Sequence, residues 1–285
     1  LIQARDTGVP QAFTPPVWAH RYPTEESFPH RDHDLSNWNT NFWWLELGGE
    51  HDSIHDTEML RDELLKIAFG VWDHIKNHGN HGAETWALEW VGFVPGKRES
   101  RRYVGDHIVT QNDVRSEGRF DDLVAYGGWS MDDHHPAGFL YAGQPTIHHS
   151  APSPFGLPYR ALYSRTIDNL LFAGRNISAT HAAMSATRVM GTCAILGQAA
   201  GTAAAIAARH ALTPRGVYEH RLHELQQTLL ADDCYLPWRV REITPRTRQA
   251  RMSASSGNSE ALRDGVDRPV GGDEHAWTAR VGSNV

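Results

Sequence analysis

Cysteine is scarce in this sequence, and positive charge is not in excess. The 285 residues include only two cysteines, Cys193 and Cys234, which are too few for a disulfide framework and lack zinc-finger spacing. The 27 Lys and Arg residues are outnumbered by 34 Asp and Glu residues, which gives a net charge of −7 with the histidines neutral. Such a charge disfavours binding to nucleic acid or to anionic membranes. A small-molecule substrate is therefore the expected partner, while the oligomeric state is left open.

The sequence also lacks targeting and membrane-spanning signals. The first residues, LIQARDTGVPQAF, contain no basic stretch followed by an apolar core, so no signal peptide is predicted. There is no initiator methionine, which suggests a processed protein or a fragment. The longest uncharged run, residues 191–208, contains Gln198, two threonines and three glycines, and it predicts a buried helix rather than a membrane span. Cytoplasmic and extracytoplasmic locations both stay open.

The spacing of apolar residues predicts a mixed α/β fold. Apolar residues recur at helical spacing from Leu60 to Ile75 and predict a helix over residues 57–77, with Thr57 as its N-terminal cap. A second helix is expected over residues 213–231, with Pro214 in its first turn. Strands are predicted around residues 41–49, 86–94, 103–110 and 161–174, and a short helix or strand within 120–139.

The stretch from Asn169 to His210 combines three features that suit a ligand site. An apolar run ends at Gly174, where the missing side chain lets the backbone approach a ligand closely. A helix then begins near Gly191, and its first N–H groups and positive dipole end favour an anionic or electron-rich partner. Gly197 and Gly201 flatten one face of this helix, so that another backbone can lie against it. The alternative is a tightly packed core helix with no ligand.

Three segments resemble the FAD-dependent oxidoreductases of the FAD_oxidored family, within the broad group of glutathione-reductase-like and fumarate-reductase-like flavoproteins. The segments are NLLFAGRNISATHAAMSATRVMGTCAILGQAAGTAAA, VPGKRESRRYVGDHIVTQNDV and LRDELLKIAFGVWDHIKN. Together they lie within about residues 35–240 and follow the order of the family. The resemblance implies FAD as the cofactor, in a partial Rossmann-like FAD-binding domain with a substrate or cap region that contains β-strands.

The resemblance also implies which residues contact the flavin. Gly174, Arg175, Asn176 and Ile177 would border the flavin ring and its ribityl chain. Gly191, Thr192 and Cys193 would offer backbone N–H groups to the electron-rich edge of the ring, where negative charge accumulates on reduction. Gln198 on the same helix completes the expected set of cofactor-binding residues.

One part of the family pattern is missing. The family carries a G-x-G-x-x-G loop after its first strand to hold the pyrophosphate of FAD, and these 285 residues contain no such motif. We therefore expect the sequence to be the C-terminal portion of a longer flavoprotein. The expected divisions are a substrate or cap region (1–160), the returning segment of the FAD-binding domain (161–240), a Ser-rich basic linker (241–260), and a tail or the truncated start of a further module (261–285).

His181 and Arg188 are the first candidates for catalysis, because they lie between the predicted flavin strand and flavin helix. A histidine exchanges protons near neutral pH, and an arginine can stabilise a developing anion. Packing or helix-capping roles are the alternative for both. Arg102, in the charged segment GKRESRR, is a candidate for positioning an anionic substrate, and the alternative there is a solvated loop.

Eighteen histidines raise the question of a metal site. His51 and His55 lie beside Asp52 and Asp56, and a second group runs from Asp132 to His135. Each group supplies too few ligands for zinc, and nothing in the sequence joins the two, so no metal site is predicted.

These patterns favour an FAD-dependent dehydrogenase or oxidase that transfers hydride from a small organic substrate to the flavin N5. The alternative is a non-catalytic binding or structural fragment that does not retain FAD. A histidine–metal hydrolase is a weaker third reading, because the sequence lacks a complete ligand set and a serine nucleophile elbow.

Overall fold

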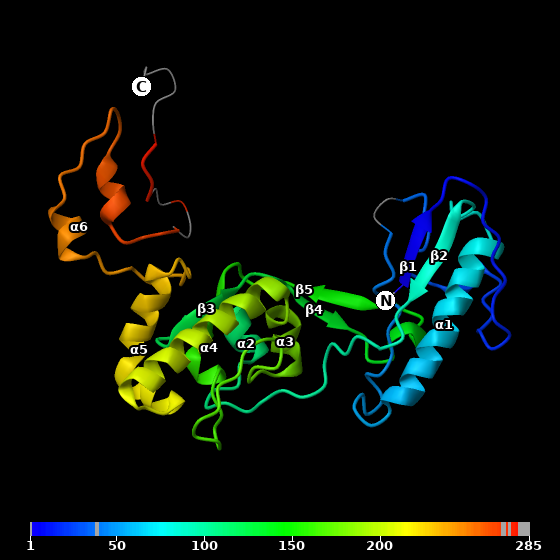
Figure 1. The fold of residues 1–285 in the computed structure, drawn as a ribbon, viewed down its shortest axis with the longest axis horizontal. Coiled ribbons are helices and arrows are strands. Elements are labelled where there is room, and N and C mark those ends of the chain that lie inside the picture. The colour runs from blue at the N-terminus through cyan, green and yellow to red at the C-terminus, as the bar shows by residue number, and fades with distance from the viewer. Residues whose placement is uncertain (1, 38–39, 269–271, 273–274, 279–285) are drawn as a thin grey trace. The chain divides into compact units, whose positions relative to one another are not determined.

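The computed structural model describes residues 2–37, 40–268, 272 and 275–278 (Figure 1). The chain divides into two compact units, which are Leu1–Ser100 with Asp133–His148, and Arg101–Asp132 with His149–Val285. Helices and small antiparallel sheets make up both, so the predicted mixed α/β class is confirmed. The functional divisions expected at residues 160/161 and 240/241 stay predictions.

The first unit is built on a long helix and a strand pair. Its apolar core gathers around α1 and includes the buried side chains of Phe28, Trp44, Ile67 and Trp72. The regular elements are β1 (Ile2–Asp6), η1 (Glu25–Ser27), α1 (Thr57–Asn77), β2 (Trp86–Val91) and η2 (Gly138–Leu140). Strands β1 and β2 pair antiparallel, with a register shift between Gln3 and Ala4.

Helix α1 has the predicted bounds, but its N-terminus differs from the prediction. Asp56 is the N-cap residue, and Thr57 is the first helical residue. The Thr57 hydroxyl donates to the carbonyls of Ser53 and Ile54, both at 2.9 Å. The hydroxyl therefore stabilises the preceding turn instead of accepting from the first N–H groups of the helix.

The second unit places three helices against a strand pair. Strands β3 and β6 pair antiparallel, and α4 and α5 both contact β3 as well as each other. The elements are α2 (Gln111–Arg115), β3 (Leu123–Gly127), β6 (Phe155–Pro158), η3 (Tyr159–Ala161), α3 (His181–Thr187), α4 (Met190–His210), α5 (Pro214–Ala231), α6 (Pro245–Gln249) and η4 (Ser259–Arg263). A third pair, β4 (Met131–His134) with β5 (Thr146–His149), completes the sheets of the described residues, and most of its residues belong to the first unit.

Helix α5 agrees with its predicted range. Pro214 occupies its first turn, and the Thr213 side chain caps it by accepting from the N–H of Gly216 at 3.1 Å. The strand predicted at 86–94 is confirmed by β2 (Trp86–Val91). Of the helix or strand expected within 120–139, the structure forms a strand, β3 (Leu123–Gly127).

Three predicted strands do not form among the described residues. Residues 41–49 contain turns and no ladder. Residues 103–110 and 161–174 make only the isolated bridges Gly105–Ser164, Val109–Ala179 and Tyr163–Leu171. The reason is that the hydrogen bonds of the 103–109 segment are too widely spaced for a ladder. Tyr103 and Val109 donate to the segment of Asn176 and Ser178, whereas His107, between them, donates to Arg160.

Helix α4 is buried along one face only. Leu196, Ala199, Ala203 and Ile206 enter the core of the second unit, while the opposite face is exposed. By length and composition alone, α4 could cross a membrane, the one helix of the described residues that could, and about a third of its apolar stretch is buried. The prediction of a buried helix thus applies to one side of α4, where it packs as a core helix.

Candidate functional site

The segment that carries the first group of predicted flavin residues is held on two sides by backbone hydrogen bonds. The N–H of Tyr103 donates to the Asn176 carbonyl at 3.0 Å, and the N–H of Ser178 donates to Ala161 at 3.1 Å. Val109 then donates to the carbonyl of Ser178 at 2.9 Å. Because these bonds come from segments far apart in the sequence, residues 174–178 are fixed relative to the core of the second unit.

The four residues of this group differ in what they can offer a ligand. Gly174 has φ +86°, in the left-handed region that favours glycine. Arg175 is exposed and Asn176 half-buried. Ile177 is fully buried in the apolar core, so its side chain anchors the segment and only its backbone can face a ligand.

The second group lies at the start of α4. Val189 is the N-cap residue and provides no side-chain hydrogen bond to the helix. Among the described residues, no acceptor meets the N–H groups of Met190, Gly191 and Thr192, whereas Cys193 donates to the Val189 carbonyl at 3.0 Å. The available donors are therefore those of residues 190–192, one position earlier than the sequence suggested, because the Cys193 N–H closes the first helical turn.

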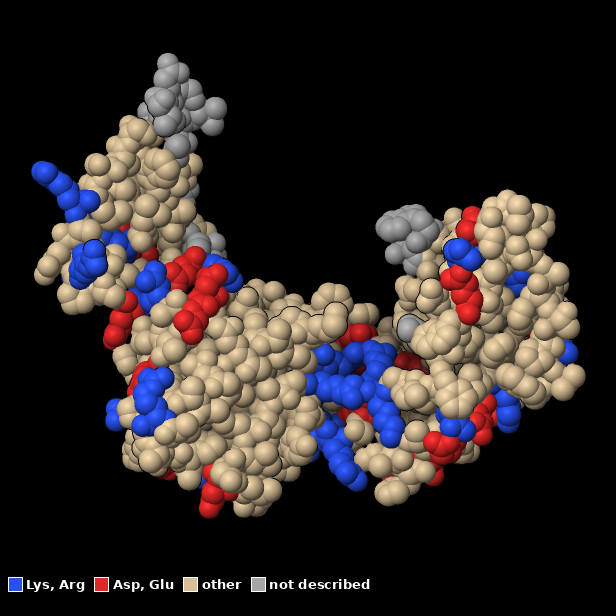
Figure 2. Space-filling view, in the orientation of Figure 1, with Lys and Arg blue, Asp and Glu red and all other residues tan. Residues whose placement is uncertain are grey.

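The exposed face of α4 is flat and uncharged. A Cβ atom added at Gly191, Gly197 or Gly201 would have nothing within 4 Å. Gln198 lies on the same exposed side. Figure 2 shows that the surface over most of α4 carries neither Lys or Arg nor Asp or Glu. A flat ring or another backbone can therefore approach this helix closely.

Positive charge lies close to the start of α4. Burial raises the pKa of the Cys193 thiol, and the positive charge of Arg175 nearby opposes that rise. The positive end of the helix dipole adds to the same field. This part of the site favours an electron-rich or anionic group.

The three catalytic candidates have different environments. His181 is the first residue of α3 and is exposed, whereas Arg188 follows the last residue of that helix. Seven residues of helix separate them by about 10 Å along the axis. Arg188 donates from Nη2 to the carbonyl and to Oδ2 of Asp132, both at 3.1 Å, so it also ties α3 to the start of β4.

Arg102 is brought beside the first flavin group through its neighbour. Tyr103 donates to Asn176, and its ring lies 5.0 Å from that of Phe172, measured between centroids. Arg102 itself is half-buried. The structure therefore brings the segment of Arg102 to residues 172–176, which the sequence alone could not establish.

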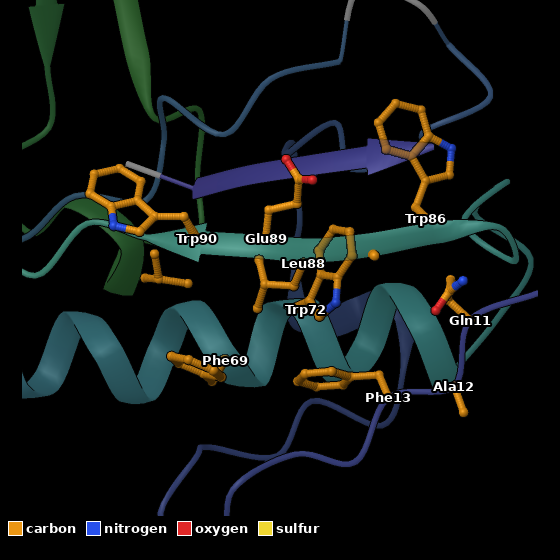
Figure 3. Close-up of a pocket in the computed structure, with 11 residues that line it drawn as sticks. Gln11, Ala12, Phe13, Phe69, Trp72, Trp86, Leu88, Glu89 and Trp90 are labelled. Atoms are coloured by element: carbon orange, nitrogen blue, oxygen red, sulfur yellow. The ribbon is translucent and has the colours of Figure 1, made fainter. Parts of the chain in front are cut away.

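A pocket of about 420 Å³ lies in the first unit (Figure 3). It is bounded by α1, β2 and the segment after β1, and aromatic side chains dominate its lining: Phe13, Phe69, Trp72, Trp86 and Trp90. None of the predicted site residues lines this pocket, since all of them belong to the second unit. Gln11 and Glu89 also line it, so the pocket surface is polar as well as aromatic.

The two histidine groups considered from the sequence serve other interactions. His55 contacts Asp52 through Nδ1 at 2.6 Å, and His135 stacks on Tyr141 with 3.6 Å between ring centroids. His134 pairs with Glu46. Metal-ligand types instead converge at Glu25, His33, His74 and His81. Local spacing could not reveal this group, because its members come from two separate parts of the chain.

Comparison with known proteins gives one match. A family model described as FAD dependent oxidoreductase matches residues 5–229, which is most of the sequence. No curated protein and no solved structure matches.

Proposed function

The chain belongs to the FAD dependent oxidoreductase family, and on that premise we propose that the start of α4 and residues 174–177 form the wall of the site that contacts the flavin ring. The observation that carries this proposal is that the N–H groups of residues 190–192 meet no acceptor in the described part of the chain and lie on a helix with an open, glycine-rich face. FAD is the cofactor of the family. We further propose that the protein transfers hydride from a small organic substrate to the flavin, which requires the flavin to bind at this wall.

The residues at this wall fit a flavin ring. Unpaired donors and the helix dipole suit the ring's electron-rich pyrimidine edge, and Arg175 adds positive charge nearby. The open positions of Gly191, Gly197 and Gly201 leave room for a flat group. When bound, FAD would supply the hydride acceptor for a substrate C–H bond.

The chain's own residues would then bind and orient the substrate. We assign His181 to proton exchange with the substrate, because its ring is exposed at the first turn of α3. Arg188 and Arg102 would position an anionic substrate group, with Arg188 held in place by Asp132. The alternative, a non-catalytic fragment that does not retain FAD, is favoured if no flavin binds.

The absence of a G-x-G-x-x-G motif leads to a test of flavin selectivity. If this sequence supplies only the ring side of the site, riboflavin, FMN and FAD gain the same contacts. Their dissociation constants for the purified chain should therefore agree within about threefold, a difference below about 1 kcal/mol. Fluorescence titration with the three flavins measures this directly. An FAD affinity a hundred times that for riboflavin would show that the chain also holds the pyrophosphate.

Gly191→Asp separates flavin binding from folding. An acidic residue in the first turn stabilises a helix, and the position has room for a side chain. The same carboxylate would repel the electron-rich ring edge and weaken riboflavin binding about fivefold or more. Gly191→Ala is the matched control, since it adds only a methyl group and should alter the affinity much less. Equal affinities for the Asp and Ala variants would contradict a flavin edge at this turn.

A further inference from the structure

Four side chains of metal-ligand type converge in the first unit. Glu25 comes from η1, His33 from the loop after it, His74 from the last turn of α1, and His81 from the turn before β2. One ligand atom of each lies within 4.8 Å of the other three. The three imidazole rings form a nearly equilateral triangle, with centroid distances of 4.6, 4.8 and 5.1 Å.

The carboxylate of Glu25 lies across this triangle. Its oxygens are 3.3 Å from His33 Nε2, 3.1 Å from His81 Nε2 and 3.7 Å from His74 Nε2. Ligands about 2.0–2.1 Å from a tetrahedral zinc ion lie about 3.3–3.4 Å from one another. The three Glu25 distances bracket this value.

Two of the rings are oriented as metal-ligating histidines are. His33 Nδ1 lies 2.8 Å from the Arg31 carbonyl, and His74 Nδ1 lies 2.6 Å from that of Tyr22. Because a carbonyl only accepts, each Nδ1 carries the proton, and the lone pair of the neutral ring is on Nε2. Such backbone partners on the second ring nitrogen fix the tautomer and direction of metal-bound histidines.

The Nε2 atoms of His33 and His74 are buried, and they make no hydrogen bond with any described residue. Unpaired buried polar atoms are unusual and point to a missing partner. A cation at the centre of the cluster would use both lone pairs.

The glycine at position 79 leaves space beside the ligand atoms, and the ring of Phe28 covers two of the histidines. Gly79 has φ +138°, and a Cβ there would lie 2.6 Å from His81 Nε2 and 3.0 Å from a Glu25 oxygen. Phe28 is buried, and its ring lies 4.7 Å from His74 and 5.1 Å from His33, measured between centroids. Only Glu25 is well exposed, with 64% of its side chain accessible, so an ion would enter from its side.

We propose that Glu25, His33, His74 and His81 bind one divalent transition-metal ion, with Zn²⁺ the best match to three imidazoles and one carboxylate. Four protein ligands complete a tetrahedral site, so the ion is structural. It would fasten the C-terminal end of α1 to the loop of residues 25–33. The proposal concerns the first unit and does not depend on the flavin site.

The test uses the full chain, dialysed against a chelator and titrated with Zn²⁺ in a calorimeter. We expect one tight equivalent, together with a higher melting temperature for the zinc-loaded chain. Glu25→Gln should weaken zinc binding at least tenfold, because it replaces a charged ligand with a neutral one. Glu26→Gln, an exposed neighbour outside the cluster, should leave the affinity unchanged.

His81→Ala should abolish the tight equivalent, and circular dichroism would check that α1 is retained. Because Glu25 is exposed, its variant keeps the test valid even where a histidine variant fails to fold. The proposal is overturned if no tight equivalent binds, if Glu25→Gln binds zinc as the unmodified chain does, or if Glu26→Gln weakens binding equally.

Discussion

Replacing Asp122 with alanine is expected to lower the free energy of unfolding by about 2–3 kcal/mol, because charge-assisted hydrogen bonds are lost while the Arg160 guanidinium keeps partial access to water. The Asp122 side chain is only 1% exposed. It accepts from the N–H, Nε and Nη2 of Arg160 at 3.0, 2.9 and 2.9 Å. Without the carboxylate, the N–H and guanidinium of Arg160 lose all three hydrogen bonds that join η3 to the residue before β3.

Urea unfolding followed by circular dichroism measures this effect. Asp121→Ala is the matched control, because the neighbouring carboxylate is fully exposed and lies 3.9 Å from Arg239, too weak a contact to register. Asp121 also supports Gln226 and Arg239 through its carbonyl, which the substitution keeps. Equal destabilisation by both variants would show that the loss does not come from the buried pair.

The elements that the sequence predicted correctly are those whose signals are local. Helix α1 follows from apolar residues at helical spacing, and α5 follows from Thr213 and Pro214 at its start. Both signals lie within one or two turns of the helix they describe. Strands at 103–110 and 161–174 failed because a strand depends on a partner elsewhere in the chain, and these segments divide their hydrogen bonds among several.

The same distinction applies to the candidate sites. The start of α4 was found within two residues, since glycines and the lack of charge mark it in the sequence. The group at Glu25, His33, His74 and His81 has no signal in the sequence, because His74 lies 41 positions after His33 and only the fold brings them together. The orientations of the His33 and His74 rings also depend on hydrogen bonds to the backbone carbonyls of Arg31 and Tyr22, and the spacing of residues in the sequence does not predict such bonds.

The glycines of α4 link stability to function. A glycine inside a helix costs about 0.8–1.0 kcal/mol relative to alanine, so it persists where it serves another purpose. Gly70 in α1 has a packing reason, because a Cβ there would lie 2.4 Å from the His20 carbonyl oxygen. Gly197 and Gly201 have no such reason among the described residues, since nothing lies within 4 Å of their Cβ positions. Close approach of a ligand or of another backbone is the remaining physical reason.

The double substitution Gly197→Ala with Gly201→Ala is therefore expected to raise the free energy of unfolding by about 2 kcal/mol in the absence of flavin. Urea unfolding measures the gain. Gly70→Ala is the control with opposite sign, since its methyl group would strike a backbone oxygen and destabilise the chain. If the open face of α4 meets the flavin or a backbone beside it, the stabilised double variant should also bind riboflavin more weakly. A gain in stability with unchanged binding would place the flavin away from these two glycines, and a loss of stability would contradict the open space around them.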